Sequence, residues 1–268
     1  MAYKILVINW QDIRNPLGGG AEVHLHEIFK QIVNMGHHVT LLSCKHKGLP
    51  GEEVVDGIHT IRRCNRNFFN FAVPLFYQQL HRQQDFDVVI DDINKIPFYT
   101  PLFIKEPLIG IMHHLFGSSI FIEAKLPVAL YVNFAEKIIP FIYRHIPMAV
   151  VSNSTKQELM AKGLAEKNIS LVQNAVDADT YQHDPEKKAK RPVVGYLGRI
   201  KKYKSVNHLI LAFINVVKEI PEASLLLIGD GDYLPKLKKL VAKLSLQNNV
   251  IFTGAIHHQE KIDYLNNM

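Results

Sequence analysis

Hydrophobic residues in this sequence gather in short runs that alternate with longer, amphipathic segments. This alternation predicts β-α-β units around a parallel sheet, and therefore an α/β fold. Most of the runs are continuously hydrophobic, so we expect strands whose two faces are both covered by helices. The runs comprise residues 4–9, 38–44, 58–63, 87–92, 108–114, 148–153, 169–174, 193–198, 224–229 and 250–254.

The segments between these runs carry the start and stop signals of helices. Gly36 ends the first predicted helix, and Ser154 or Thr155 is expected to cap a later one. Ser205 is expected to cap the helix over residues 206–219. Serine and threonine accept hydrogen bonds from the free amides of a helix start, whereas glycine adopts the left-handed backbone of a helix end.

A polar, charged segment without periodicity, residues 177–192, interrupts the pattern and indicates a linker. Seven of the predicted strands precede it and three follow it. We therefore predict two Rossmann-like domains, residues 1–185 and 186–268, with the first strand of the second domain starting at Val193.

Composition argues against a membrane-spanning or secreted protein. The chain is 47% hydrophobic and 21% charged, and no uncharged apolar run approaches the ~18 residues of a membrane helix. Its first residues lead straight into a strand without a signal-peptide layout, so we expect a cytoplasmic location. Cys44 and Cys64 provide neither a disulfide framework nor metal-ligand spacing, and are expected to be reduced thiols.

The net charge of +6 predicts an anionic partner, for which nucleic acid, acidic lipid and sugar nucleotides all qualify. Basic residues concentrate from Lys187 onward. Nucleic acid is disfavoured, because Tyr203 is the one aromatic residue within the basic string 199–204 and no nucleic-acid-binding motif occurs.

Two loops have the composition of phosphate-binding sites. Gly18, Gly19 and Gly20 separate a strand from a helix, where backbone N–H groups and the helix dipole face an open crevice. Their spacing does not match the dinucleotide fingerprint, and a plain flexible turn remains an alternative. In the second domain, Arg199 follows a strand and Lys204 precedes a helix, so the pair is placed to hold a diphosphate. Each charge-assisted hydrogen bond there contributes roughly 1.5–3 kcal/mol; a solvated basic loop is the alternative.

Seven strings occur in order over nearly the whole chain: "GGGAE" with "GHHV" after its helix, "PLIGIMHHLFG", "VVSNSTKQEL", "VQNAVDADTY", "YLGRIKKYKS", "LLLIGDGD" and "NNVIFTGAI". With these strings the chain resembles a family 4 glycosyltransferase of the GT-B fold. The resemblance implies two Rossmann-like domains that face each other across a cleft. It also implies that a nucleotide-diphosphate sugar binds mostly to the second domain.

The resemblance also implies roles for individual residues. His113 matches a histidine that ends a strand beside the donor sugar and serves catalysis, although a core histidine with a satisfied hydrogen bond remains an alternative. Gly19 and Gly20 would approach the donor phosphate or sugar, and Arg199 with Lys204 would hold the diphosphate. The nucleobase would lie against Gly254, Ala255 and Ile256.

The implied activity is a retaining, metal-independent transfer to an acceptor hydroxyl on a glycan, a lipid-linked molecule or a small molecule. It needs no cofactor beyond the donor. The strings around Asp177 and Asp230, and the pairs His37–His38, His113–His114 and His257–His258, are not expected to bind a metal. A catalytically inactive nucleotide-sugar-binding module or fragment is the alternative function.

Three departures from the family pattern have consequences. Ser205 and Ala175 each replace a glycine, which predicts an altered local backbone. The family's paired-glutamate motif would lie beyond Met268. Three strands form only half of a doubly wound sheet, so we expect an open edge at residues 193–198. The chain alone is then predicted to bind donor weakly and turn over poorly, either as a fragment or as a protein that a partner completes.

The segment Leu126–Pro147 combines aromatic and aliphatic residues with a few cations. We expect a packed helix broken at Pro140. Peripheral contact with the inner face of a membrane, close to a lipid-linked acceptor, is the alternative.

Overall fold

The computed structural model describes residues 1–94, 96–176, 178–256 and 258–268. The chain forms two compact units, Met1–Ala175 and Val176–Met268. The boundary precedes the one expected after residue 185 because the polar segment packs against the last helix. The Asp184 backbone N–H donates to Asn266 Oδ1 (2.9 Å), and the Ala189 N–H donates to the Asn267 carbonyl (3.1 Å). The expected linker therefore belongs largely to the second unit.

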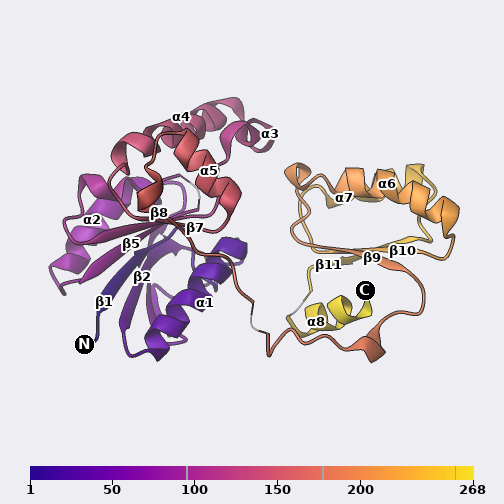
Figure 1. The fold of residues 1–268 in the computed structure, drawn as a ribbon, viewed down its shortest axis with the longest axis horizontal. Coiled ribbons are helices and arrows are strands. Elements are labelled where there is room, and N and C mark those ends of the chain that lie inside the picture. Colours follow the sequence, from indigo (N-terminus) through magenta and orange to yellow (C-terminus); the bar gives the residue numbers. More distant parts are fainter. Residues whose placement is uncertain (95, 177, 257) are drawn as a thin grey trace. The chain divides into compact units, whose positions relative to one another are not determined.

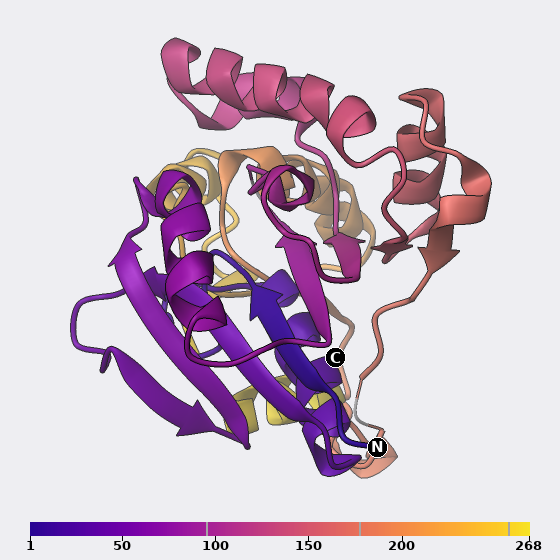
Figure 2. The ribbon, with the colours of Figure 1, turned by 90° about the vertical axis from the view of Figure 1, so that its left-hand side faces the viewer.

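The first unit is built on an eight-stranded sheet in the order β3-β4-β2-β1-β5-β6-β7-β8 (Figures 1 and 2). Only β3 runs antiparallel to its neighbour, as expected for a doubly wound fold with an added edge strand. Seven of these strands match the predicted ones. The charged segment of β3 was not predicted as a strand. The bounds are β1 (Lys4–Ile8), β2 (His38–Lys45), β3 (Glu52–Val55), β4 (Ile58–Asn65), β5 (Val88–Ile93), β6 (Leu108–Met112), β7 (Met148–Val150) and β8 (Ile169–Leu171).

Helices cover both faces of this sheet, as the continuous hydrophobic runs predict. Leu6 and Ile8 of β1 join a core cluster with Phe69 of α2, whereas Ile5 and Val7 pack with residues of α1. Successive side chains of one strand thus serve two cores. The helices are α1 (Gly20–Asn34), α2 (Phe69–His81), α3 (Ile120–Glu123), α4 (Leu126–Ile142) and α5 (Asn153–Ala161), with 3₁₀ turns η1 (Thr100–Leu102), η2 (Gly117–Ser119) and η3 (Glu166–Asn168).

Two helix predictions in the first unit were wrong. The cap of α5 is Ser152, whose Oγ accepts the Thr155 N–H (3.2 Å), and not Ser154 or Thr155. Pro140 lies inside α4 without breaking it, and the Tyr143 N–H donates to the Ile139 carbonyl (2.9 Å) at its end. No helix within the described ranges combines the length and hydrophobicity needed to cross a bilayer.

The second unit contains a parallel three-stranded sheet in the order β11-β10-β9. The prediction that β9 forms an edge of the sheet is confirmed. The prediction that helices cover both faces of the strand was wrong for β9, because Val194 and Leu197 are exposed. Phe213, Leu225 and Leu237 form part of its core. The elements are η4 (Pro185–Lys187), β9 (Val193–Leu197), η5 (Lys202–Lys204), α6 (Val206–Glu219), β10 (Ser224–Ile228), α7 (Leu234–Lys243), β11 (Val250–Gly254) and α8 (His258–Asn267).

A buried ion pair fixes the loop between β1 and α1. Arg62 of β4 is fully buried, and its Nε and Nη2 donate to the two carboxylate oxygens of Asp12, each at 2.7 Å. Arg62 Nη1 also contacts Glu53 Oε1 at 2.6 Å. The Asp12 carbonyl in turn accepts the Asn15 N–H (3.1 Å). The guanidinium therefore holds the loop that leads to the three glycines.

Replacing Asp12 tests this constraint. Asp12→Ala leaves Arg62 buried with one carboxylate instead of two, so we expect a loss of roughly 3–5 kcal/mol in the free energy of unfolding of the first unit. The single tryptophan, Trp10, lies in the core of this unit and reports its urea unfolding by fluorescence. Arg14→Gln is the control, because it removes only the exposed contact with Glu53 (3.9 Å), worth less than ~1 kcal/mol. Equal effects of the two substitutions on the free energy of unfolding would contradict a stabilising role for the Arg62–Asp12 ion pair.

Candidate functional site

Polar residues collect where β1, β5 and β6 end. These strands are parallel neighbours, so their carboxyl ends share one edge of the sheet, where α/β folds bind ligands. Asn9 follows β1, Asp92 and Asn94 lie at the end of β5, and His113 follows β6; all four are buried. The sequence analysis had identified only His113. The polar residues directly after two other hydrophobic runs were the signal that could have revealed the rest.

His113 is held on two sides. Its Nε2 lies 2.9 Å from Asp92 Oδ1, and its ring contacts the ring of His24 edge-to-face, with centroids 5.3 Å apart and an interplanar angle of 88°. Its carbonyl accepts a hydrogen bond from Thr155 Oγ1 (3.1 Å). The histidine is thus buried and partnered, and its orientation is fixed before any ligand arrives.

His24, on the first turns of α1, was not identified from the sequence. Burial lowers the pKa of His24, and the neighbouring His113 lowers it further. Both ring nitrogens are buried and have no hydrogen-bond partner among the described residues. Unsatisfied buried polar atoms cost about 1–3 kcal/mol each. They are frequent where water or a ligand completes the bonding, so His24 marks this strand edge as a polar binding site.

Glu22 ties the glycine loop to the same edge. Its Oε2 accepts the Gly19 N–H (2.6 Å), and its Oε1 accepts a hydrogen bond from Asn94 Nδ2 (3.0 Å). Asn94 Nδ2 also donates to Asn9 Oδ1 (2.8 Å). The loop, the start of α1 and the ends of β1 and β5 therefore form one hydrogen-bonded unit.

The glycines of the loop differ in what they allow. A Cβ at Gly18 would lie 3.0 Å from the Asn15 carbonyl oxygen, so the fold itself favours glycine there. A Cβ at Gly20 would meet no heavy atom within 4 Å, and this residue is exposed. The Gly19 amide already bonds to Glu22. The space that a side chain would take at Gly20 is therefore open to a ligand.

A second buried carboxyl group neighbours the His113 partner. Asp91 Oδ2 accepts hydrogen bonds from Thr100 Oγ1 (2.5 Å) and the Tyr143 hydroxyl (2.6 Å). Burial raises the pKa of Asp91 to about 6. Because adjacent strand residues point to opposite faces, Asp91 fixes η1 and the end of α4 while Asp92 serves His113.

In the second unit, glycines bring the strand ends into backbone contact. A Cβ at Gly229 would lie 2.0 Å from the Gly198 carbonyl oxygen, and the Gly229 N–H donates to the Gly254 carbonyl (3.0 Å). Gly254 is the last residue of β11, and Ala255 and Ile256 follow it at this edge. Gly229, at the end of β10, thus contacts both Gly198, which precedes Arg199, and Gly254 of the segment expected to bind a nucleobase.

Arg199 and Lys204 are both exposed in the loop between β9 and α6. Neither pairs with a carboxylate among the residues that the structure describes, whereas the neighbouring Lys201 bonds to Asp232 Oδ2 (2.7 Å). Lys204 Nζ lies 5.1 Å from the centroid of the Tyr203 ring. The loop therefore offers two uncompensated positive charges beside the amino end of α6.

Ser205 occupies a position at which the family pattern has glycine, and it adopts the backbone conformation that glycine favours. Its φ of 54° and ψ of 28° are left-handed, and its side chain makes no capping hydrogen bond. Ser205 is the N-cap residue of α6, as predicted, but its hydroxyl does not cap the helix, because the left-handed backbone replaces the extended conformation of a serine cap. The loop keeps a glycine-like conformation in spite of the substitution.

The candidate metal strings are engaged in other contacts. Asp230 Oδ1 accepts the Gly231 N–H (2.7 Å), and Asp232 pairs with Lys201. Asp177 and His257 lie outside the described residues. Within the described part of the chain, histidine, cysteine and carboxylate side chains form no group of three or more that can hold a metal ion.

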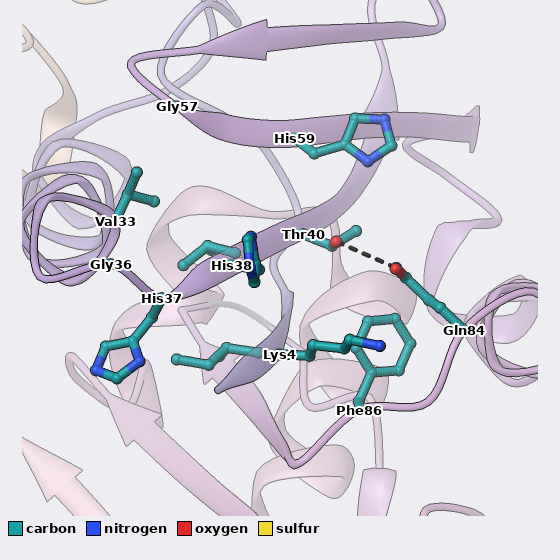
Figure 3. Close-up of a pocket in the computed structure, with 12 residues that line it drawn as sticks. Lys4, Val33, Gly36, His37, His38, Thr40, Gly57, His59, Gln84 and Phe86 are labelled. Atoms are coloured by element: carbon teal, nitrogen blue, oxygen red, sulfur yellow. Dashed lines mark hydrogen bonds between the residues drawn. The ribbon is translucent and has the colours of Figure 1, made fainter. Parts of the chain in front are cut away.

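A separate cavity of about 570 Å³ lies at the amino-terminal edge of the first sheet (Figure 3). Lys4, His37, His38 and Phe86 contribute to its walls, and Gln84 Nε2 bonds to Thr40 Oγ1 across it (3.3 Å). Since β1 and β2 begin here, the cavity is at the opposite edge from the polar cluster.

Comparison with known proteins agrees with the resemblance seen in the sequence. Residues 18–180 match the model of Glycosyltransferase Family 4, and residues 177–268 match that of Glycosyl transferases group 1. The phosphatidylinositol N-acetylglucosaminyltransferase gpi3 subunit of Schizosaccharomyces pombe is 22% identical over 93% of this chain and 56% of its own length. The chain thus spans little more than half of that relative.

Two further proteins are similar over different extents. The alpha-monoglucosyldiacylglycerol synthase of Streptococcus pneumoniae is 40% identical over 25% of this chain and 15% of its own length. The structure of Anabaena HepE in complex with UDP-glucose superposes with a TM-score of 0.72 at 18% identity. It covers 98% of this chain and 71% of HepE. The predicted α/β, GT-B fold is confirmed.

The raised pKa of Asp91 predicts a pH-dependent stability. Between the unfolded pKa of 3.8 and the folded value of about 6, the folded state binds more protons. The carboxyl group should therefore lose about 3 kcal/mol of stabilisation as the pH rises through this range. Asp91→Asn should remove this pH-dependent loss of stabilisation, because asparagine does not ionise. The free energy of unfolding of the variant relative to the parent should therefore increase with pH. Urea unfolding at several pH values measures it, and a pH-independent difference would contradict the prediction.

The left-handed backbone of Ser205, in the loop between β9 and α6, predicts an effect of substitution on stability. Ser205→Gly removes the Cβ from a left-handed residue and should stabilise the second unit by up to about 1 kcal/mol. Hydrogen exchange of the α6 amides measures the change. Ser205→Ala is the matched control, because it keeps the Cβ and should give no gain. The same gain in both variants would show that the hydroxyl, and not the backbone, is responsible.

Proposed function

Because the chain belongs to Glycosyltransferase Family 4, we propose that it transfers a sugar from a nucleotide-diphosphate sugar to an acceptor hydroxyl. The observation that carries the proposal is the pair of uncompensated cations, Arg199 and Lys204, at the end of β9. The complex of HepE with UDP-glucose supports this class of donor.

Each part of the donor has a proposed binding segment. Arg199 and Lys204 bind the diphosphate and stabilise the charge that develops on it as the glycosidic bond breaks. The amino end of α6 adds a favourable dipole. Gly254, Ala255 and Ile256 contact the nucleobase, and Gly19 and Gly20 approach the sugar or phosphate.

His113 is the proposed catalytic residue beside the sugar. Its hydrogen bond with the buried Asp92 fixes the orientation of the ring. We propose a retaining reaction that needs neither metal nor cofactor. The acceptor oxygen attacks the anomeric carbon, its proton leaves with the departing diphosphate, and no enzyme nucleophile is assigned.

A lipid-linked acceptor is favoured over a free glycan or a small molecule. The names of the phosphatidylinositol N-acetylglucosaminyltransferase gpi3 subunit and of the alpha-monoglucosyldiacylglycerol synthase both refer to membrane lipids. We accordingly propose a cytoplasmic protein that contacts the inner membrane face peripherally. Nucleic acid is not a proposed partner.

A nucleotide-sugar-binding module without transfer activity is the second candidate. It is favoured by the open edge of β9, since the donor loop follows that strand. It predicts donor binding with no product.

The test combines binding and turnover. A thermal-shift panel of uridine, guanosine and adenosine diphosphates and their sugars identifies the donor. Transfer from that donor to phosphatidylinositol or diacylglycerol is followed by NMR of the product's anomeric proton. Retention supports the transferase, and inversion overturns the proposed stereochemistry. Binding without transfer selects the inactive module, and affinity that follows phosphate number but not the sugar favours nucleic acid.

Removing the cations tests the diphosphate assignment. Arg199→Ala and Lys204→Ala should each weaken nucleoside-diphosphate affinity by roughly 10- to 100-fold in calorimetric titrations, because each loses a charge-assisted hydrogen bond. Lys202→Ala, an exposed lysine of the same loop, is the matched control and should change affinity by less than about threefold. Equal losses in all three variants would indicate a general charge effect and not a site.

A further inference from the structure

Exposed hydrophobic side chains occur on α2 and α4 of the first unit; both helices are labelled in Figure 1. On α4, Phe134 is 63% exposed and Phe141 is 77% exposed. A contiguous exposed apolar area of this kind marks an interaction site in most soluble proteins. The α2–α4 surface is defined here by Phe71, Leu75, Leu126, Leu130, Phe134 and Phe141.

The two helices form one continuous surface. Asn70 Nδ2 of α2 donates to the hydroxyl of Tyr131 of α4 (3.0 Å). The rings of Phe71 and Tyr131 stack, with centroids 6.5 Å apart and an interplanar angle of 26°. The apolar faces are therefore presented together and not as two isolated patches.

Both faces of α4 are hydrophobic. Ala129, Val132 and Ile139 pack inward and are buried, while Leu130 and Phe134 point outward. A helix that is apolar all round is stable only when a second apolar phase covers its outer face. The 17 residues of α4 do not form a membrane-spanning candidate, so its outer face needs a surface to lie on.

The charges on α4 select the occupant. Over residues 123–145 the exposed ionisable side chains include the cations Lys125, Lys137 and Arg144 and one carboxylate, Glu123, whereas Glu136 is buried. Cations that border an apolar face attract anionic lipid headgroups. A second copy of this chain on the same face would bring these cations together, so an anionic bilayer is the better fit.

The buried carboxylate connects this surface to the His113 segment. Glu136 Oε1 accepts the Phe116 N–H (2.6 Å), and its Oε2 accepts the Gly117 N–H (2.9 Å). These amides lie three and four residues after His113 along the chain. The inner face of α4 therefore holds the segment that leaves β6, while the outer face presents hydrophobic side chains.

We propose that the α2–α4 surface docks on an anionic bilayer and that Glu136 transmits the position of the docked helix to residues 114–117. A lipid-borne acceptor would then be presented beside His113. The docking and its transmission stand on the geometry of the first unit, whereas delivery of an acceptor rests on the proposed function.

Docking is measured without any substrate. The full chain is co-sedimented with phosphatidylcholine vesicles, with and without 30% phosphatidylglycerol, at low and high salt. We expect binding that requires the anionic lipid and weakens with salt. Phe134→Ser with Phe141→Ser should weaken it at least about tenfold, since each loses a large apolar side chain.

Two exposed hydrophobic residues outside the surface, Val54 on β3 and Leu211 on α6, provide matched controls. Val54→Ser with Leu211→Ser should leave vesicle binding unchanged. Absence of binding to anionic vesicles, or equal losses in both double variants, overturns the proposal. Light scattering that finds a dimer, abolished by Phe134→Ser, would assign the surface to a second copy instead. Trp10 fluorescence confirms that the first unit of each variant is folded, and far-ultraviolet circular dichroism does so for the whole chain.

The link through Glu136 is tested by hydrogen–deuterium exchange. Anionic vesicles should slow exchange over residues 114–117 in the parent chain. In Glu136→Gln, vesicle binding should persist, because the outer face is unchanged, but this protection should fall at least about threefold, because an amide oxygen accepts hydrogen bonds less strongly than a carboxylate. Identical protection in both proteins overturns the link. Since neither readout requires transfer, loss of the transferase assignment would leave this result intact.

Discussion

The hydrogen-bonded ion pair between Arg62 and Asp12 sets the arrangement on which the first unit's site depends. It fixes the β1–α1 loop from β4, which lies two strands away from β1 in the sheet, and α1 starts where that loop ends. Glu22 and His24 are consequently delivered to the ends of β5 and β6, where they meet Asn94 and His113. Burying a guanidinium is favourable only with matched acceptors, so the loop conformation and the ion pair require each other.

The two units prepare their sites by different physical means. In the first, side chains at strand ends hold one another through hydrogen bonds, and His113 is oriented by Asp92 and His24. In the second, backbone packing at Gly198 and Gly229 fixes the strand ends, while Arg199 and Lys204 remain exposed. The first unit thus presents polar side chains that hold one another in place, whereas the second presents cations that are free to move.

Hydrophobic pattern alone located ten strands, because continuous apolar runs are the strongest signal of buried parallel strands. It missed β3, whose Glu52 and Glu53 conceal an edge strand that supplies an acceptor to Arg62. Helix starts were less predictable, since adjacent serines and threonines offer the same chemistry and only tertiary position selects Ser152. His24 was missed for a similar reason: its role depends on a contact with a strand nearly ninety positions away in the sequence.

The adjacent carboxyl groups of β5 determine the register of this strand, which its hydrophobic residues alone do not determine. Val88, Val89 and Ile90 would be equally buried if the strand slid by one position, because both faces of the sheet are covered. Such a slip would turn Asp91 away from Tyr143 and Asp92 away from His113. Both carboxyl groups would then be buried without a hydrogen-bond partner. The register of this central strand is thus set by the hydrogen bonds of Asp91 and Asp92 at its carboxyl end. The residues that build the site therefore also fix the pairing of the sheet.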